Sequence, residues 1–315
     1  MSSESSNELF VQIVDTFNEI YGSHASTRAV HAKGTLCAGT FTADPSASTL
    51  TRAAHMQGDP VPAHVRFSNA SGDPHKPDGS RESRGMAVKL YLDDGTTTDI
   101  VAVTVPTFVV RTPEDFLEIT RSRVPDPATG KPDDEKIGKF LEAHPESMAT
   151  IFAAMSAQPP GSYGQLTYHA VHAFGFENAA GERRWARYRW EPEAGEASLD
   201  PAEAKARALD YLDDDLEERF AGGGVGFRLW AQLAEDADDV DDPTAAWPDE
   251  REQVSLGRLH VTGFASDREK DGDVLVFDPT RVTDGITLSG DRILNARPHA
   301  YAESVFRRSG VRREP

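Results

Sequence analysis

Two residues near the C-terminus, Arg297 and Tyr301, have types and spacing that suit metal binding. They are four residues apart, and on a helix this spacing places both side chains on one face. A guanidinium beside a phenol favours the ionised phenolate, because an opposite charge stabilises the charged form. A phenolate is a hard anionic oxygen that can bind ferric iron. On these residues alone, the alternative is a core tyrosine beside a surface arginine.

A histidine close to the N-terminus, His31, is the main candidate for acid–base chemistry among the ten histidines of the chain. It enters a predicted strand, lies three residues after Arg28, and is followed by Ala32-Lys33-Gly34, which are small or flexible enough for a ligand to approach closely. An imidazole can accept and return a proton near neutral pH. The alternative is a hydrogen-bonded histidine in a strand without a catalytic role.

A third group of candidates lies in two predicted strands. Arg66 and Ser68 point to one face of a strand and Phe67 to the other, because side chains alternate. An arginine that faces inward in an apolar barrel is costly unless an anion pairs with it; the alternative is an exposed arginine. Residues 101–111, with Phe116 beyond them, form an apolar wall that suits a flat hydrophobic cofactor or a plain core.

Eight strands and several helices must position these residues. The predicted strands span residues 35–43, 61–68, 85–92, 98–105, 164–176, 184–191, 225–233 and 256–264. The predicted helices span residues 9–22, 113–122, 133–143 and 145–156, and two more begin at Asp200 and Ser289. In the last helix Ser289 is the expected cap, and Pro298 should kink the helix or delay its first turn. Eight antiparallel strands are enough to close a barrel with an interior cavity.

The composition is that of an acidic globular protein. The 315 residues, of which 38% are hydrophobic and 27% charged, form one large domain or two and can enclose a cofactor. The net charge of -19 argues against nucleic acid or an anionic membrane as a partner. The only cysteine, Cys37, cannot form an intrachain disulfide. With no apolar run of membrane length and a polar, acidic N-terminus, we expect a cytoplasmic protein.

Many of these segments occur in an order that resembles the haem catalase family. The similar segments are residues 28–34, 65–68, 81–91 and 99–101, then Pro106, Phe108 and Arg111, then residues 168–174, 247–248, 257–259, 277–279 and 285–286, and finally Arg297, Tyr301 and Arg308. Full-length catalases carry an N-terminal arm and a C-terminal helical domain that have no counterpart here. The chain is therefore similar to the short catalase-related peroxidases, which consist of the haem barrel alone.

The resemblance implies an α+β fold with a closed antiparallel eight-stranded barrel and with inserted and C-terminal helices. We expect one catalase-like haem-binding domain over residues 1–315, with the barrel core at about 24–280 and the helix of the proximal haem ligand at about 289–309.

The resemblance also assigns roles on the two sides of a haem b. Tyr301 would be the proximal iron ligand, and Arg297 would keep it ionised. His31 would be the distal acid and base, which takes a proton from the peroxide and returns it to the departing oxygen. Ser68 would hydrogen-bond the other imidazole nitrogen and fix its tautomer.

The remaining family positions would hold the porphyrin. Phe116 would stack on its distal face. Arg28, Arg66 and Arg308 would bind the two propionates, and three arginines against two carboxylates is a reasonable charge balance.

One departure from the family pattern bears on the reaction. Catalases carry an asparagine pair at the positions of Val103 and Thr104, and a glycine at Ala102, and one asparagine helps to hold the peroxide. Thr104 keeps a hydroxyl and is the third catalytic candidate, but adjacent strand residues face opposite sides, so only one of the two can reach the site. Oxidation of a second hydrogen peroxide needs that molecule to be positioned, so we expect weak or no catalase activity.

The resulting prediction is a haem peroxidase that reduces hydrogen peroxide or organic hydroperoxides with a small organic reductant. We expect neither nucleic acid nor a membrane as a partner, and a homodimer is the assembly considered. Three alternatives remain at this point. They are hydroperoxide rearrangement of the kind carried out by allene oxide synthase, a non-catalytic haem carrier or sensor, and a haem-free ligand-binding barrel.

Overall fold

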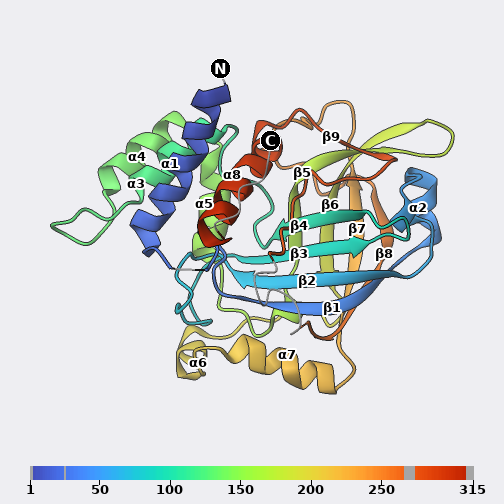
Figure 1. The fold of residues 1–315 in the computed structure, drawn as a ribbon, viewed down its shortest axis with the longest axis horizontal. Coiled ribbons are helices and arrows are strands. Elements are labelled where there is room, and N and C mark those ends of the chain that lie inside the picture. Colours follow the sequence, from blue (N-terminus) through green and yellow to red (C-terminus); the bar gives the residue numbers. More distant parts are fainter. Residues whose placement is uncertain (1–2, 25, 266–273, 310–315) are drawn as a thin grey trace.

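The computed structural model describes residues 3–24, 26–265 and 274–309, and its centre is a closed β-barrel (Figure 1). The strands are β1 (Gly34–Ala43), β2 (Val61–Asn69), β3 (Arg84–Tyr91), β4 (Thr97–Val103), β5 (Tyr168–Glu177), β6 (Arg183–Pro192), β7 (Val225–Leu233), β8 (Gln253–Phe264) and β9 (Ile286–Leu288). They form one antiparallel sheet in the order β4-β3-β2-β1-β8-β7-β6-β5-β9. The pairing of Val103 with His169 joins β4 to β5 and closes β1–β8 into a barrel, which confirms the predicted fold.

The interior of this barrel is filled by side chains. Along β7, buried and half-buried residues alternate without a break, the pattern of a strand with one face on a core. Phe67 of β2 points inward and packs against the rings of Tyr163, Tyr168 and Phe227 at centroid distances of 5.5 to 6.2 Å. The expectation of a cavity inside the barrel therefore does not hold, because apolar side chains occupy that space.

The helices lie around the barrel. They are α1 (Ser3–Tyr21), α2 (Pro45–Leu50), α3 (Pro113–Ser122), α4 (Asp134–Ala143), α5 (Ser147–Ser156), α6 (Pro201–Ala206), α7 (Tyr211–Ala221) and α8 (Arg292–Ser309), with short 3₁₀ turns at Ala54–Met56 and Tyr163–Gln165. Figure 1 shows α8 between the barrel and the group formed by α1, α3 and α4, whereas α6 and α7 run along another side. In the described part of the chain, no helix combines the length and apolarity that a membrane crossing requires.

Three local predictions need correction. The helix expected from Asp200 is two helices, α6 and α7, and the strand expected from residue 164 begins at Tyr168, after a 3₁₀ turn. The cap of α8 is Asp291 and not Ser289, since Asp291 Oδ1 accepts hydrogen bonds from the backbone N–H groups of Ile293 and Leu294 at 2.8 and 3.1 Å. Pro298 lies inside α8, which continues to Ser309.

The outer face of β2, β3 and β4 carries three rows of paired residues. The intervening residues, such as Phe67, Met86 and Ala102, belong to the barrel core. The register therefore fixes which side chains leave the barrel. The rows are Ser68–Gly85–Val103, Arg66–Ala87–Val101 and His64–Lys89–Asp99.

The third row anchors residues 278–281, which lie between β8 and β9 in the sequence. Lys89 Nζ and Arg281 Nη1 donate to the two carboxylate oxygens of Asp99 at 2.6 and 2.5 Å, and the backbone N–H of Asp278 donates to the second oxygen at 2.8 Å. Burial raises the pKa of Asp99 and lowers that of Lys89, so each charge in this cluster depends on the other for its stability. Asp99 thereby holds residues 278–281 against the barrel.

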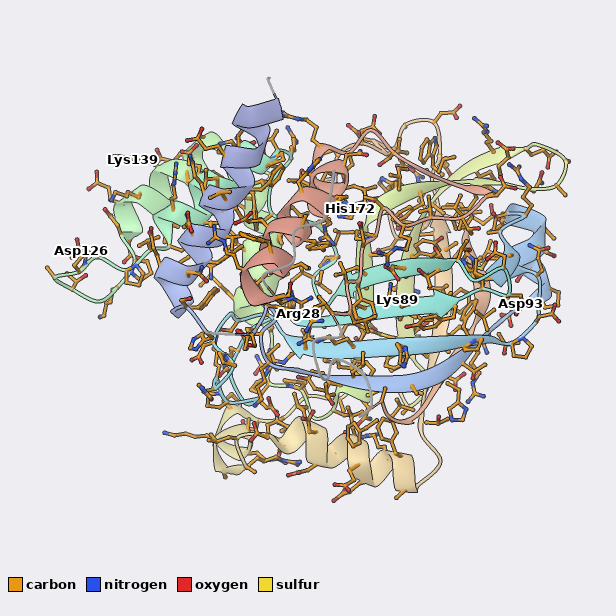
Figure 2. The ribbon with its side chains drawn as sticks, viewed as in Figure 1. Arg28, Lys89, Asp93, Asp126, Lys139 and His172 are labelled. Carbon is orange, nitrogen blue, oxygen red and sulfur yellow. The ribbon has the colours of Figure 1, made fainter. Side chains whose placement is uncertain are left out.

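Replacing Asp99 by Asn should destabilise the protein by about 3–5 kcal/mol, because it leaves the buried Lys89 cation without its carboxylate. Urea unfolding followed by circular dichroism measures the loss. The matched control is Asp93→Asn, in the exposed turn between β3 and β4 (Figure 2), where we expect a change within about 0.5 kcal/mol. An Asp99→Asn variant as stable as the control would show that the cluster does not anchor the segment.

Candidate active site

A cavity of about 410 Å³ lies between the outer face of β2–β4 and the helices α1, α3 and α8. Most of the side chains that line it are apolar. Four arginines also line it, whereas no aspartate or glutamate of the described residues does: the four are Arg28, Arg66, Arg297 and Arg308. An apolar cavity with several guanidiniums is suited to a hydrophobic ligand that carries anionic groups.

His31 lies on the strand wall of this cavity, in the bend before β1 rather than in the strand itself. Its φ of 55° is uncommon for a residue other than glycine. Its Nδ1 is 3.0 Å from Ser68 Oγ. A Cβ atom at Gly85 would lie 2.9 Å from that same nitrogen and 2.8 Å from Ser68 Oγ, so only glycine allows this pair to pack against β3.

The surroundings of His31 keep its imidazole neutral. Burial lowers its pKa to about 3, and the positive charges of Arg66, Arg297 and Arg28 act in the same direction. A neutral imidazole has one donor nitrogen and one acceptor nitrogen. When Nδ1 donates to Ser68, Nε2 is left as a base.

Helix α8 forms the opposite wall through residues that recur every three or four positions. They are Ile293, Ala296, Arg297, Ala300, Tyr301, Ser304, Val305 and Arg308. Arg297 Nη1 donates to the Tyr301 hydroxyl at 3.3 Å, and its guanidinium lies 5.8 Å from the centroid of the Phe108 ring. The prediction that Arg297 and Tyr301 share a helix face is confirmed, and Pro298 between them does not prevent the contact.

Behind Arg297 lies a buried pair whose contact the sequence patterns do not indicate, His172 of β5 and Asp291 at the start of α8. His172 Nδ1 is 2.5 Å from Asp291 Oδ2, while the described residues offer its Nε2 no hydrogen-bond partner. Burial and then the charge of Arg297 lower the pKa of His172 to about 4. Both residues were visible in the sequence, within the family-like strand segment and at the helix start, but their contact joins distant parts of the chain.

Three arginines come together at the cavity from distant parts of the sequence. Arg28 Nη2 and Arg308 Nη2 donate to one acceptor, the backbone carbonyl of Leu275, at 3.1 and 3.2 Å. Arg66 Nη2 donates to the carbonyl of Ala32 at 3.3 Å. Figure 2 shows Arg28 beside α8, at the end of the barrel that faces the helices. Their positive charges lie on the cavity that also contains His31.

Phe116 of α3 also lines the cavity, and its ring centroid is 5.4 Å from that of Phe108. Thr104 does not line it. The Thr104 hydroxyl accepts a hydrogen bond from the backbone N–H of Arg84 at 2.9 Å, and the neighbouring Val103 faces the cavity instead. The prediction of Thr104 as a catalytic residue is therefore wrong for this geometry, because Thr104 follows the last residue of β4 and its hydroxyl is turned towards the backbone of Arg84.

Comparisons with known proteins agree with this fold and site. The family model described as Catalase matches residues 10–314. A catalase-related peroxidase of Mycolicibacterium paratuberculosis is 40% identical over 303 residues, covering 96% of this chain and 95% of the relative. A catalase-related peroxidase of Synechococcus elongatus is 34% identical over 298 residues, covering 95% and 88%.

Two solved structures have the same fold. A fungal catalase superposes with a TM-score of 0.80 at 23% identity, covering 92% of this chain and 61% of that one. A bacterial catalase superposes with a TM-score of 0.80 at 26% identity, covering 91% and 58%. This chain thus spans about three fifths of those catalases, but nearly all of the two catalase-related peroxidases. On the family model and these relatives, the chain belongs to the catalase family.

Proposed function

We propose that this protein is a haem b peroxidase that reduces hydrogen peroxide or organic hydroperoxides with a small organic reductant. The observation that carries the proposal is one cavity that joins the Arg297–Tyr301 pair to the His31–Ser68 pair. Membership of the catalase family implies a haem cofactor, and the relatives named catalase-related peroxidase support the peroxidase reaction. The comparisons favour neither hydroperoxide rearrangement nor haem transport.

The residues of the cavity fit a haem. Phe108 and Phe116 offer apolar ring surfaces to a flat macrocycle. We propose that Arg28, Arg66 and Arg308 hold its two propionates, which is consistent with the lack of aspartate and glutamate among the described residues that line the cavity.

We further propose Tyr301 as the iron ligand, with Arg297 stabilising the phenolate through charge and the 3.3 Å hydrogen bond. Behind this pair, His172 and Asp291 fix the position of the helix that carries both residues. A bound haem supplies a redox-active iron that exchanges electrons with the peroxide and the reductant.

The protein's own contribution on the peroxide side is proton transfer. We propose that neutral His31 takes the proton of the peroxide at its basic Nε2 and returns it to the departing oxygen, while Ser68 orients the ring through Nδ1. With a phenol as the reductant, one organic hydroperoxide and two phenols give one alcohol, one water and two phenoxyl radicals. With hydrogen peroxide, a second water takes the place of the alcohol.

The strand wall of the cavity, formed by β2, β3 and β4, is the reason why we propose weak catalase activity. Val103 occupies the row of Ser68 and Gly85 and faces the cavity, so its aliphatic side chain lies where a hydrogen-bonding group could hold a second peroxide. A valine offers no such bond. Electrons for the second half of the cycle then come from another molecule.

Replacing His31 by Ala should leave haem binding in place and reduce peroxide turnover by about 10²–10⁴-fold, because the proton-transfer group is removed. The Soret band of the purified variant measures haem content, and oxidation of a phenolic dye measures turnover. The control is His260→Ala, on the far strand β8. A variant with full turnover would indicate a haem carrier or another catalytic base. Wild-type protein that shows no Soret band after growth with iron and haem would contradict the proposed function itself.

Replacing Val103 by Asn should raise oxygen release from hydrogen peroxide roughly tenfold, the effect of one added hydrogen bond of about 1–1.5 kcal/mol. An oxygen electrode measures the rate. Thr104→Asn is the matched control, since this side chain points away from the cavity and should give no increase. Equal gains in the two variants, or strong oxygen release by the wild type, would contradict the assigned role of Val103.

The rate of peroxide reduction should stay flat from pH 8 to about pH 5, because a His31 with a pKa near 3 remains an unprotonated base over that range. Stopped-flow consumption of peroxide measures it. The lowered pKa has a further effect on stability. Above pH 6.5 the contribution of His31 to the free energy of unfolding is constant. This contribution falls as the pH decreases from 6.5 towards 3, because His31 binds its proton in the unfolded chain before it does so in the folded protein. A rate loss centred near pH 6.5 would contradict the buried environment of His31.

A further inference from the structure

A tyrosine and a histidine form a hydrogen-bonded pair on the outer face of the strand wall, beside the cavity. The Tyr91 hydroxyl and His64 Nδ1 are 2.7 Å apart, and the two rings meet edge to face with their centroids 5.2 Å apart. Both side chains are half-buried, so solvent reaches part of the pair. The roles proposed for His31 and Tyr301 make no use of it.

The pair lies one row beyond the residues that line the cavity. His64 is two residues from Arg66 along β2, roughly 7 Å, and Arg66 lines the cavity. Lys89 is the cross-strand partner of His64, and its Nζ lies 5.3 Å from the ring centroid of Phe277, which also lines the cavity. Figure 2 shows Lys89 on the strand wall, farther along the barrel than Arg28. The pair is thus close to the cavity and accessible from solvent at the same time.

The contact between the two side chains is the one that oxidation of a tyrosine requires. A phenol that loses an electron becomes a strong acid, so the electron leaves readily only where a base takes up the proton. An imidazole nitrogen is such a base, and 2.7 Å is within the distance over which a positioned base accepts a proton. His64 can therefore receive the hydroxyl proton of Tyr91.

The described contacts of the other tyrosines do not offer such a base. Three of them donate to amide or carbonyl oxygens, which do not take up a proton: Tyr163, Tyr168 and Tyr211. The hydroxyls of Tyr21 and Tyr301 accept hydrogen bonds from arginines. Tyr188 lies in the barrel core, where burial raises its pKa and opposes the loss of its proton.

The size of the cavity gives an electron path through the protein a purpose. Its volume of about 410 Å³ is near the lower end of the range for small-molecule sites, about 300–1,000 Å³. A porphyrin and a peroxide leave little of this space for a reductant. A reductant that stays outside can still take part if a residue near the surface passes its electrons on.

We propose that Tyr91 is a redox-active residue that passes electrons from phenols at the protein surface to the cavity, with His64 as its proton acceptor. Tyr91 gives one electron towards the cavity, where the peroxide is reduced, and its hydroxyl proton moves to His64 Nδ1. A phenoxyl radical beside an imidazolium remains. This inference rests on the proposed peroxidase function and extends it to phenols that are too large to enter the cavity.

A phenol at the surface restores the pair. It supplies one electron to the Tyr91 radical and releases its own proton to solvent, while the proton on His64 returns to the Tyr91 oxygen. Two such cycles provide the two electrons that one peroxide requires. The two protons released by the phenols balance the two that are taken up when hydrogen peroxide becomes two waters.

The first experiment looks for the radical directly. Haem-loaded protein is mixed with an equimolar amount of hydrogen peroxide without a reductant and frozen at once. We expect the electron paramagnetic resonance signal of a tyrosyl radical, which narrows when the protein contains ring-deuterated tyrosine and is lost in Tyr91→Phe. Tyr21→Phe is the matched control, since Tyr21 is half-buried as well. A signal that survives in Tyr91→Phe, or that Tyr21→Phe removes, would overturn the proposal.

The substitution His64→Gln tests the proton acceptor while Tyr91 stays in place. A glutamine can accept a hydrogen bond from the hydroxyl but does not take up its proton. Formation of the radical should slow by about 10²-fold, the lower end of what a positioned base contributes. His260→Gln, at a half-buried histidine of β8, should leave the rate unchanged. An unchanged rate in His64→Gln would overturn the role of the pair.

A reductant that cannot enter the cavity separates this inference from the proposed function. With tyramine coupled to dextran as the phenol, Tyr91→Phe should lose most of the oxidation rate, whereas stopped-flow reaction of the haem-loaded variant with peroxide should keep the wild-type rate. Full oxidation of the coupled phenol by Tyr91→Phe would overturn the inference and leave the peroxidase function intact. Wild-type protein that does not react with peroxide would overturn the proposed function, and the inference with it.

Discussion

The site depends on the two-residue alternation of β2, β3 and β4. Because successive side chains leave opposite faces of a strand, the register that packs Phe67, Met86 and Ala102 inside the barrel also places Ser68, Gly85 and Val103 in one row outside it. The helices α1, α3 and α8 then enclose this row. A slip of one residue in β2 would exchange the core and the site, so the packing of the barrel interior keeps the chemistry outside it in place.

The arginines of the cavity have two effects with one physical origin. Their positive charge suits a cofactor with two carboxylates, and the same charge, added to burial, keeps His31 unprotonated. Val103 completes the arrangement, since it adds no hydrogen-bonding group next to the base. The charges and the burial of the pocket thus keep His31 neutral next to arginines that suit an anionic cofactor. The strand wall, through Val103, limits which molecules can be held beside His31.

Much of this could be predicted from the sequence, and the misses have physical reasons. Alternation and turn residues indicated all eight barrel strands, and the spacing of Arg297 and Tyr301 indicated their contact. Alternation cannot tell the inside of a closed sheet from its outside, so the cavity was expected on the wrong face. The pair formed by His172 and Asp291 was missed because helix and strand periodicity carry no information on contacts between distant segments.

The carbonyl of Leu275 accepts hydrogen bonds from both Arg28 and Arg308, which lie near opposite ends of the described chain. During synthesis, all eight barrel strands emerge from the ribosome before the last turn of α8 does. A nascent chain can therefore form the strand wall with His31 and Ser68 while the arginine end of the pocket is still incomplete. Cofactor insertion would then follow the synthesis of α8.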